Sequence, residues 1–265
     1  MTDTDTRRPA RHDAGPGRDL AAYTLRLGDD ALVLAQRLCE WITRAPTVEE
    51  DLALSNIALD LLGQARTLFS QSGRHDGTGR DEDELAYGRE PSEFRNVLLA
   101  ELPNGDFADL VARQLVWTHH ALLRYEALRD AGDPELAGLA RRAAEETRYH
   151  RAHADRWVAC LAHGTPESKR RLQDALDRVW PYTDELFEAD GPVRRLARNG
   201  TVTSPTALRE AWEQEMTTVL AEAGLRRPTV TEHRCGGRRG AHTPGFPDLI
   251  AELREVRRAH PGGTW

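Results

Sequence analysis

A carboxylate and two imidazoles share one face of a predicted long helix. Glu146, His150 and His153 stand at positions i, i+4 and i+7, so their side chains point in the same direction from an α-helix. Carboxylate oxygens and imidazole nitrogens are common ligands of zinc and iron. The segment is therefore a candidate metal site, which Glu40 or Asp60 from neighbouring helices could complete.

The spacing differs from that of the ferritin-like di-iron proteins. Those proteins take one Glu from each of two helices and a Glu-x-x-His pair from each of the other two. None of the ten histidines here has an acidic residue three positions earlier. Gly63 stands three residues after Asp60, and His150 comes one residue too late after Glu146, rotated by about 100°. The sequence therefore predicts no catalytic, cofactor-binding or metal-ligating residue of the di-iron kind.

A structural role explains the same residues. Asn56, Asp60 and Gln64 form a polar stripe at four-residue spacing, which could hydrogen-bond across a helical bundle to the acidic and histidine side chains named above. We favour this interpretation, with a degenerate or mononuclear metal site as the alternative. Because neighbouring residues of a helix differ by about 100°, we expect only one of His119 and His120 to face the core.

One loop could recognise an anion. Residues 236–240 read Gly-Gly-Arg-Arg-Gly, and such a loop can cradle a phosphate or carboxylate with backbone N–H groups and guanidiniums. It has no preceding strand and no Lys-Ser/Thr pair, so it is not a nucleotide P-loop. Arg238 and Arg239 could hold the acidic part of a ligand, or the loop could dock on a partner protein.

Composition limits the classes of function. The chain has 265 residues with 39% hydrophobic, 6% aromatic and 30% charged residues, and a net charge of −7. These values are typical of a helix-rich globular protein and favour neither nucleic acid nor an anionic membrane as a partner. The three cysteines form no Cys-x-x-Cys pair and no signal sequence precedes them, which predicts a reducing cytoplasmic location.

Apolar periodicity predicts the elements that would position these side chains. Core-facing helices are expected over 20–45, 47–70, 105–131 and 133–163, the first interrupted or recapped near residues 28–30, and a long crossover over 71–103. Further helices are expected over 166–180, 204–223 and 246–260, with a loop before the second of these. No segment alternates with period two. We therefore predict an all-α, ferritin-like four-helix bundle with a long crossover and additional C-terminal helices.

The domain organisation follows from these elements. Residues 1–19 are polar and rich in Asp, Arg, Gly and Pro, which is typical of a disordered N-terminal tail. Residues 20–265 carry the helical pattern without a composition break. We expect them to form a single helical domain.

Several segments resemble a known family, the C subunits of the bacterial multicomponent phenylacetyl-CoA epoxidase. The segments are residues 23–30, 34–41, 51–66, 104–109, 148–150, 211–213 and 236–243, and the terminal Trp265. The resemblance covers nearly everything from Leu20 onward. It implies a ferritin-like fold and a role in aerobic phenylacetate catabolism.

The resemblance also implies partners and cofactors. In that family the C subunit is a non-catalytic structural chain that lacks metal ligands and supports a catalytic A subunit. The A subunit holds the di-iron centre and epoxidises the aromatic ring of phenylacetyl-CoA, and a separate reductase subunit supplies electrons through flavin and iron–sulfur groups. Two alternatives remain: an oxygenase subunit with its own site at Glu146, His150 and His153, and a module that binds coenzyme A through Arg238 and Arg239.

Overall fold

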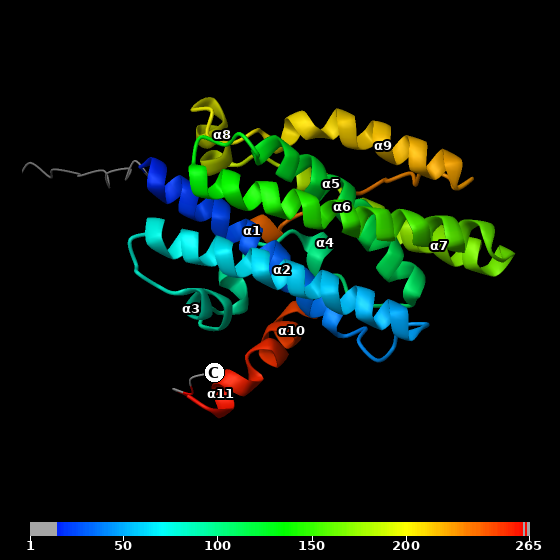
Figure 1. Ribbon diagram of the computed structural model, residues 1–265, viewed down its shortest axis with the longest axis horizontal. Helices are drawn as coiled ribbons and strands as arrows, with labels where there is room; N and C mark the ends of the chain where they lie inside the picture. The colour runs from blue at the N-terminus through cyan, green and yellow to red at the C-terminus, as the bar shows by residue number, and fades with distance from the viewer. Residues whose placement is uncertain (1–14, 262, 264–265) are drawn as a thin grey trace, which may run out of the picture.

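The computed structural model describes residues 15–261 and 263, and within them it contains helices and no strands (Figure 1). In chain order the helices and 3-10 turns are α1 (Pro16–Cys39), α2 (Val48–His75), α3 (Glu82–Tyr87), η1 (Pro91–Glu93), α4 (Leu98–Glu101), α5 (Phe107–Leu128), α6 (Pro134–His163), α7 (Pro166–Val179), η2 (Trp180–Tyr182), η3 (Asp184–Phe187), α8 (Gly191–Arg198), η4 (Pro205–Leu208), α9 (Arg209–Glu222), η5 (Gly237–Arg239), α10 (Phe246–Leu253) and α11 (Glu255–Ala259). The predicted all-α class is confirmed.

Four long helices, α1, α2, α5 and α6, form the bundle. Helix α1 packs along α2 and α5 packs along α6, while α2 also contacts α6 (Figure 1). Residues 76–106 connect α2 to α5 and carry α3, η1 and α4. This is the predicted ferritin-like arrangement with one long crossover.

Side-chain caps start most of the bundle helices at the predicted places. Thr47 accepts a hydrogen bond from a backbone N–H three residues later, and Asp106 and Asp133 do the same at the starts of α5 and α6. Pro134 follows Asp133 at the first helical position, where a missing N–H costs nothing. Thr165 repeats the device for α7.

Helix α1 runs without interruption through Gly28, contrary to the predicted break there. A Cβ atom at Gly28 would lie 2.6 Å from a ring carbon of Phe69 on α2. The glycine therefore permits close contact between two helices instead of ending one. Helix α1 stops at Cys39, and the connection to α2 contains Thr43 with a φ of 72°.

The carboxylates that follow Gly28 are buried and paired. Asp29 and Asp30 are both 0% exposed. Arg89 of the crossover forms an ion pair with Asp29, while Arg238 donates to Asp30 at 2.8 and 3.0 Å. Arg124 of α5 lies 3.5 Å from Asp30. The predicted recapping at residues 29–30 was wrong because these side chains are needed for tertiary ion pairs.

The beginning of α1 also differs from expectation. The predicted tail covered residues 1–19, but α1 starts at Pro16. Asp19 is 4% exposed and pairs with Arg195 of α8 at 2.6 and 2.7 Å, so tertiary contact orders this turn. Residues 1–14 and Trp265 lie outside the described part of the chain.

The C-terminal part has more helices than the three predicted. Helix α7 ends where Trp180-Pro181 begins a 3-10 turn, as expected from proline at that position. Helix α8 lies in a segment predicted as loop, because its eight residues are too few to establish a helical period. Helices α9, α10 and α11 follow, and α10 and α11 extend away from the bundle in Figure 1.

The buried Asp30 is expected to be critical for stability. Asp30→Asn keeps the shape of the side chain but removes the buried charge with which Arg238 and Arg124 pair, so we expect a loss of about 3–5 kcal/mol in the free energy of unfolding. Urea denaturation measures this. Asp174→Asn, which removes an exposed partner of Arg170, is the control and should change stability little; equal losses in both variants would contradict the assignment.

Candidate functional site

Glu146 lies at one end of a chain of hydrogen bonds between bundle side chains. The amide of Gln64 on α2 donates to its carboxylate at 2.8 Å. The hydroxyl of Tyr125 on α5 donates to the Gln64 side-chain oxygen at 2.8 Å. Burial raises the pKa of Glu146, and nearby Asp60 raises it further, while the Gln64 bond lowers it. This chain of bonds joins three helices.

His150 and Asp60 form a separate pair between α6 and α2. The imidazole Nε2 lies 2.9 Å from an Asp60 oxygen. The His150 side chain is 4% exposed and that of Asp60 38% exposed, so the pair lies at the boundary between the bundle interior and solvent. Burial lowers the pKa of His150 more than the Asp60 carboxylate raises it.

His153, one turn further along α6, bonds to a different carboxylate. Its Nε2 contacts Glu50 at the start of α2, and the indole of Trp157 donates to the same carboxylate at 2.7 Å. Glu50 and His153 are 6% and 6% exposed. The Glu50 side chain turns into the bundle, where it is the hydrogen-bond partner of both His153 and Trp157.

Glu40 lies elsewhere, at the end of α1. It accepts hydrogen bonds from Arg37 at 2.6 Å and from Asn104 at 2.9 Å. It therefore belongs to the connection between α1 and the start of α5. It is not joined to the α2–α6 pairs.

The five candidate ligands thus occupy four separate hydrogen-bonded groups. Within the described residues, no three His, Cys, Asp or Glu side chains are grouped so that they could hold a metal ion. A di-iron centre needs carboxylates that reach two metals together with terminal imidazoles. This donor set does not fit such a centre, and the hydrogen-bonded structural interpretation describes it better. That the chain holds no metal stays a prediction.

The predicted polar stripe of α2 is found for Asp60 and Gln64, which hydrogen-bond to α6, but not for Asn56. Gly63 was expected at a ligand position facing the bundle axis, but it is exposed, and a Cβ there would meet nothing within 4 Å among the described residues. Gln64 faces Glu146, as the predicted polar stripe indicated. Asn56, expected in the same inward stripe, is also exposed. The core positions Ile57, Leu61 and the following apolar residues determine this rotation.

His119 and His120 are both buried, contrary to the prediction that only one of them would face the core. The ring of His119 contacts Glu215 of α9 at 2.6 Å and Asp155 of α6 at 2.9 Å, whereas His120 packs edge-on against Phe187 at 5.3 Å. Both are covered because α6, α7 and α9 surround α5 on several sides.

The glycine-arginine loop already holds a carboxylate from its own chain. The backbone N–H groups of Gly236 and Arg238 donate to Glu185 at 2.9 and 3.1 Å. Arg238 is buried against Asp30, and Arg239 contacts Glu188 at 3.2 Å. The Arg238 guanidinium therefore faces the interior, whereas the hypothesis that the loop contacts coenzyme A stays a prediction.

Helix α2 carries a second apolar face that we had not predicted. Val48, Leu52, Leu59 and Leu62 are exposed by 73%, 61%, 64% and 36%, and their spacing places them on one side of the helix. Tyr149 of α6 is 52% exposed. The buried residues of α2 are different from these four. The sequence did carry a signal for this second face, because the helix has more leucines than one buried stripe can hold. Exposed apolar patches of this kind mark interaction surfaces.

Comparison with known proteins identifies the family. A family model described as phenylacetic acid catabolic protein matches residues 4–265. The chain belongs to this family. The C subunit of 1,2-phenylacetyl-CoA epoxidase from Escherichia coli (strain K12) is 43% identical over 246 residues, covering 93% of this chain and 99% of that protein. The predicted resemblance is confirmed, and these matches support a role in phenylacetate catabolism.

Two histidines of the chain should respond oppositely to acid. Burial lowers the pKa of His150 in the folded chain. As the pH falls, the unfolded chain therefore binds a proton at this histidine before the folded chain does, and stability falls as the pH drops below 6.5. Burial also lowers the pKa of His119, but Asp155 and Glu215 raise it more. Its contribution is therefore fully present below 6.5 and is lost as the pH rises through the raised pKa.

The difference between wild type and each His→Gln variant isolates these contributions. On going from about pH 7.5 to about pH 5, the stability advantage of wild type over His150→Gln should shrink, and that over His119→Gln should grow. Urea denaturation at both pH values gives the four differences. Shifts of the same sign for the two histidines would be incompatible with their different surroundings.

Proposed function

We propose that this chain is the non-catalytic structural subunit of a hetero-oligomeric phenylacetyl-CoA epoxidase that acts in aerobic phenylacetate catabolism. It supports a catalytic A subunit, which carries the di-iron centre and epoxidises the aromatic ring. Flavin and iron–sulfur groups belong to a separate reductase subunit, and this chain holds no cofactor. The proposed complex is the one named for the Escherichia coli relative.

The observation that carries the proposal is the outer face of α2. Four exposed apolar side chains, Val48, Leu52, Leu59 and Leu62, follow one side of a helix whose other side fills the core. Leaving them in water forfeits the free energy of burying apolar surface, which is about 25 cal/mol per Å². A permanent partner subunit would cover such a face, because obligate interfaces are rich in apolar residues.

The polar interior supports the non-catalytic part of the proposal. The pairs Gln64–Glu146, Asp60–His150 and Glu50–His153 lie between α2 and α6, directly behind the apolar face. Pairs of this kind fix how the two helices lie against each other. They would hold α2 rigid for a partner, a structural task that needs no metal.

The expected location is the cytoplasm. None of the helices among the described residues is long and apolar enough to cross a membrane. Cys39, Cys160 and Cys235 are free thiols, which suits a reducing compartment.

A charge on the apolar face should prevent assembly. Leu59→Asp is expected to reduce co-purification with the catalytic subunit by roughly tenfold or more, because a carboxylate would be buried without a partner. Val256→Asp makes the same change at an exposed apolar residue of α11 and serves as the control. Iron analysis of each separated chain should find iron on the catalytic subunit only; stoichiometric iron on this chain would refute the non-catalytic assignment.

The metal-binding alternative makes a different prediction for His150. If the pairing with Asp60 is structural, His150→Ala should lower stability while the assembled complex keeps its epoxidase activity per catalytic subunit. Activity is measured after the complex has been isolated, so that loss of assembly is counted separately. Normal assembly with abolished turnover would favour a metal site at Glu146, His150 and His153.

A further inference from the structure

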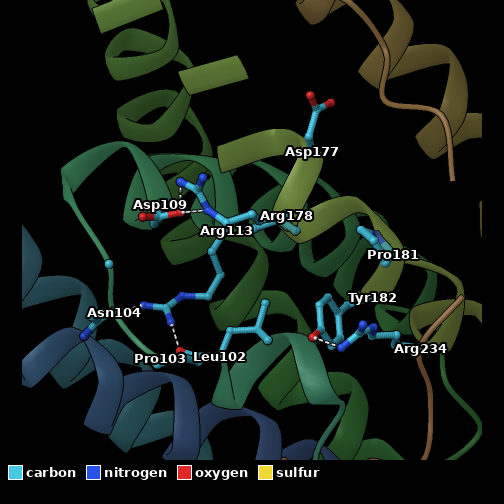
Figure 2. Close-up of a pocket in the computed structure, with 12 residues that line it drawn as sticks. Leu102, Pro103, Asn104, Asp109, Arg113, Asp177, Arg178, Pro181, Tyr182 and Arg234 are labelled. Carbon is cyan, nitrogen blue, oxygen red and sulfur yellow. Dashed lines mark hydrogen bonds and ion pairs between the residues drawn. The ribbon is translucent and has the colours of Figure 1, made fainter. Parts of the chain in front are cut away.

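A pocket of about 510 Å³ opens at one end of the molecule, where the start of α5 meets the end of α7 and η2. Figure 2 shows Asn104, Arg113 and Asp109 on one side, with Pro181, Tyr182 and Arg234 on the other. Its volume lies within the range of small-molecule sites. None of the α2–α6 pairs described above lines it.

Arg113 in this wall is a buried cation that forms no ion pair among the described residues. It is 2% exposed, and it donates to the Leu102 carbonyl at 2.6 Å and to the Asn104 side-chain oxygen at 2.6 Å. Its Nε has no hydrogen-bond partner among the described residues, although a guanidinium carries five N–H donors. Burial, together with nearby Arg37, lowers the pKa of Arg113 to about 10, while nearby Glu40 and Asp109 raise it.

The acidic residues of the pocket are committed to other arginines. Arg178 donates to Asp109 at 2.6 and 2.8 Å, and Arg226 donates to Asp177 at 2.7 Å. Arg234 contacts the hydroxyl and ring of Tyr182, at 3.5 and 5.9 Å. The uncompensated charge of the pocket is therefore positive, and it comes from Arg113 and Arg234.

The remaining wall is apolar. Leu102, Pro103, Val179, Pro181 and the ring of Tyr182 line it. A hydrated inorganic ion would gain nothing from such a surface, whereas the hydrocarbon part of an organic anion would bury its area there. An aromatic ring is well suited because it could pack against the Tyr182 ring.

We propose that this pocket binds a small organic anion, with its apolar body against Leu102, Val179 and Tyr182 and its carboxylate or phosphate group attracted by Arg113 and Arg234. The site is independent of the proposed structural role. It needs neither a metal nor the apolar face of α2. Carboxylate and phosphate share the guanidinium chemistry, so the probes must separate them.

Calorimetric titration of the full-length chain tests the site with benzoate and phenyl phosphate as probes. Benzyl alcohol lacks the charge, and acetate and inorganic phosphate lack the ring. We expect saturable binding of at least one aromatic anion with a Kd of about 1 mM or lower, weakened by added salt, and much weaker binding of the three control compounds. The stronger of the two probes identifies the headgroup.

Two substitutions connect the binding to the pocket. Arg234→Gln removes an exposed cation without disturbing the core and should weaken binding roughly tenfold, the effect of losing one charged hydrogen bond. Arg170→Gln is the matched control, since Arg170 pairs with Glu167 and Asp174 on α7 and does not line the pocket. Tyr182→Ala should also weaken the aromatic probes.

Three results would overturn the proposal. They are the absence of saturable binding, equal affinity for benzyl alcohol and benzoate, and unchanged affinity in both Arg234→Gln and Tyr182→Ala. Because Arg234 is on the surface, its variant remains informative even if changes at the buried Arg113 prevent folding.

Discussion

Two adjacent carboxylates in the middle of α1, Asp29 and Asp30, must be neutralised away from water, and much of the chain's path follows from this. Neighbouring helix positions differ by about 100°, so the two side chains point to different surroundings. Arg89 of the crossover pairs with Asp29, while Arg238 of the C-terminal loop pairs with Asp30. The crossover and the C-terminal segment are thus tied to the same turn of one helix.

The C-terminal segment docks through further buried carboxylates. Glu185 accepts the backbone N–H groups of Leu98, Gly236 and Arg238. Glu101 contacts the ring of His242 and also accepts the N–H of Thr243. Buried carboxylates with several charge-assisted hydrogen bonds are directional, so they determine where an irregular segment lies when it has little apolar surface of its own.

The polar groups between α2 and α6 follow the same logic. A ferritin-like bundle offers room on its axis for acidic and imidazole groups that would otherwise hold metal. Here Gln64 donates to Glu146 and accepts from Tyr125. His150 pairs with Asp60, and His153 pairs with Glu50. The outer side of α2 and the pocket beside Arg113 are then two separate surfaces, one apolar and one cationic.

Local signals in the sequence were enough to predict the helices and their connections. Caps such as Thr47 and Asp133 and the apolar spacing of Leu54, Ile57 and Leu61 depend on residues a few positions apart, and such local signals predicted the bundle and its long crossover. The absent Glu-x-x-His pattern also indicated that the di-iron ligand set was incomplete. Membership of the family followed from motifs distributed along most of the chain.

The pairing of side chains, in contrast, emerged only from the folded molecule. Local spacing could not show that Asn56 and Gly63 face outward, because the rotation of α2 depends on how it packs against α1 and α6. It could not show that Arg238 pairs with Asp30, 208 residues away in the chain. Such pairings depend on burial, which removes water as a competing partner and makes each charge require a specific neighbour. Burial is a property of the assembled helices.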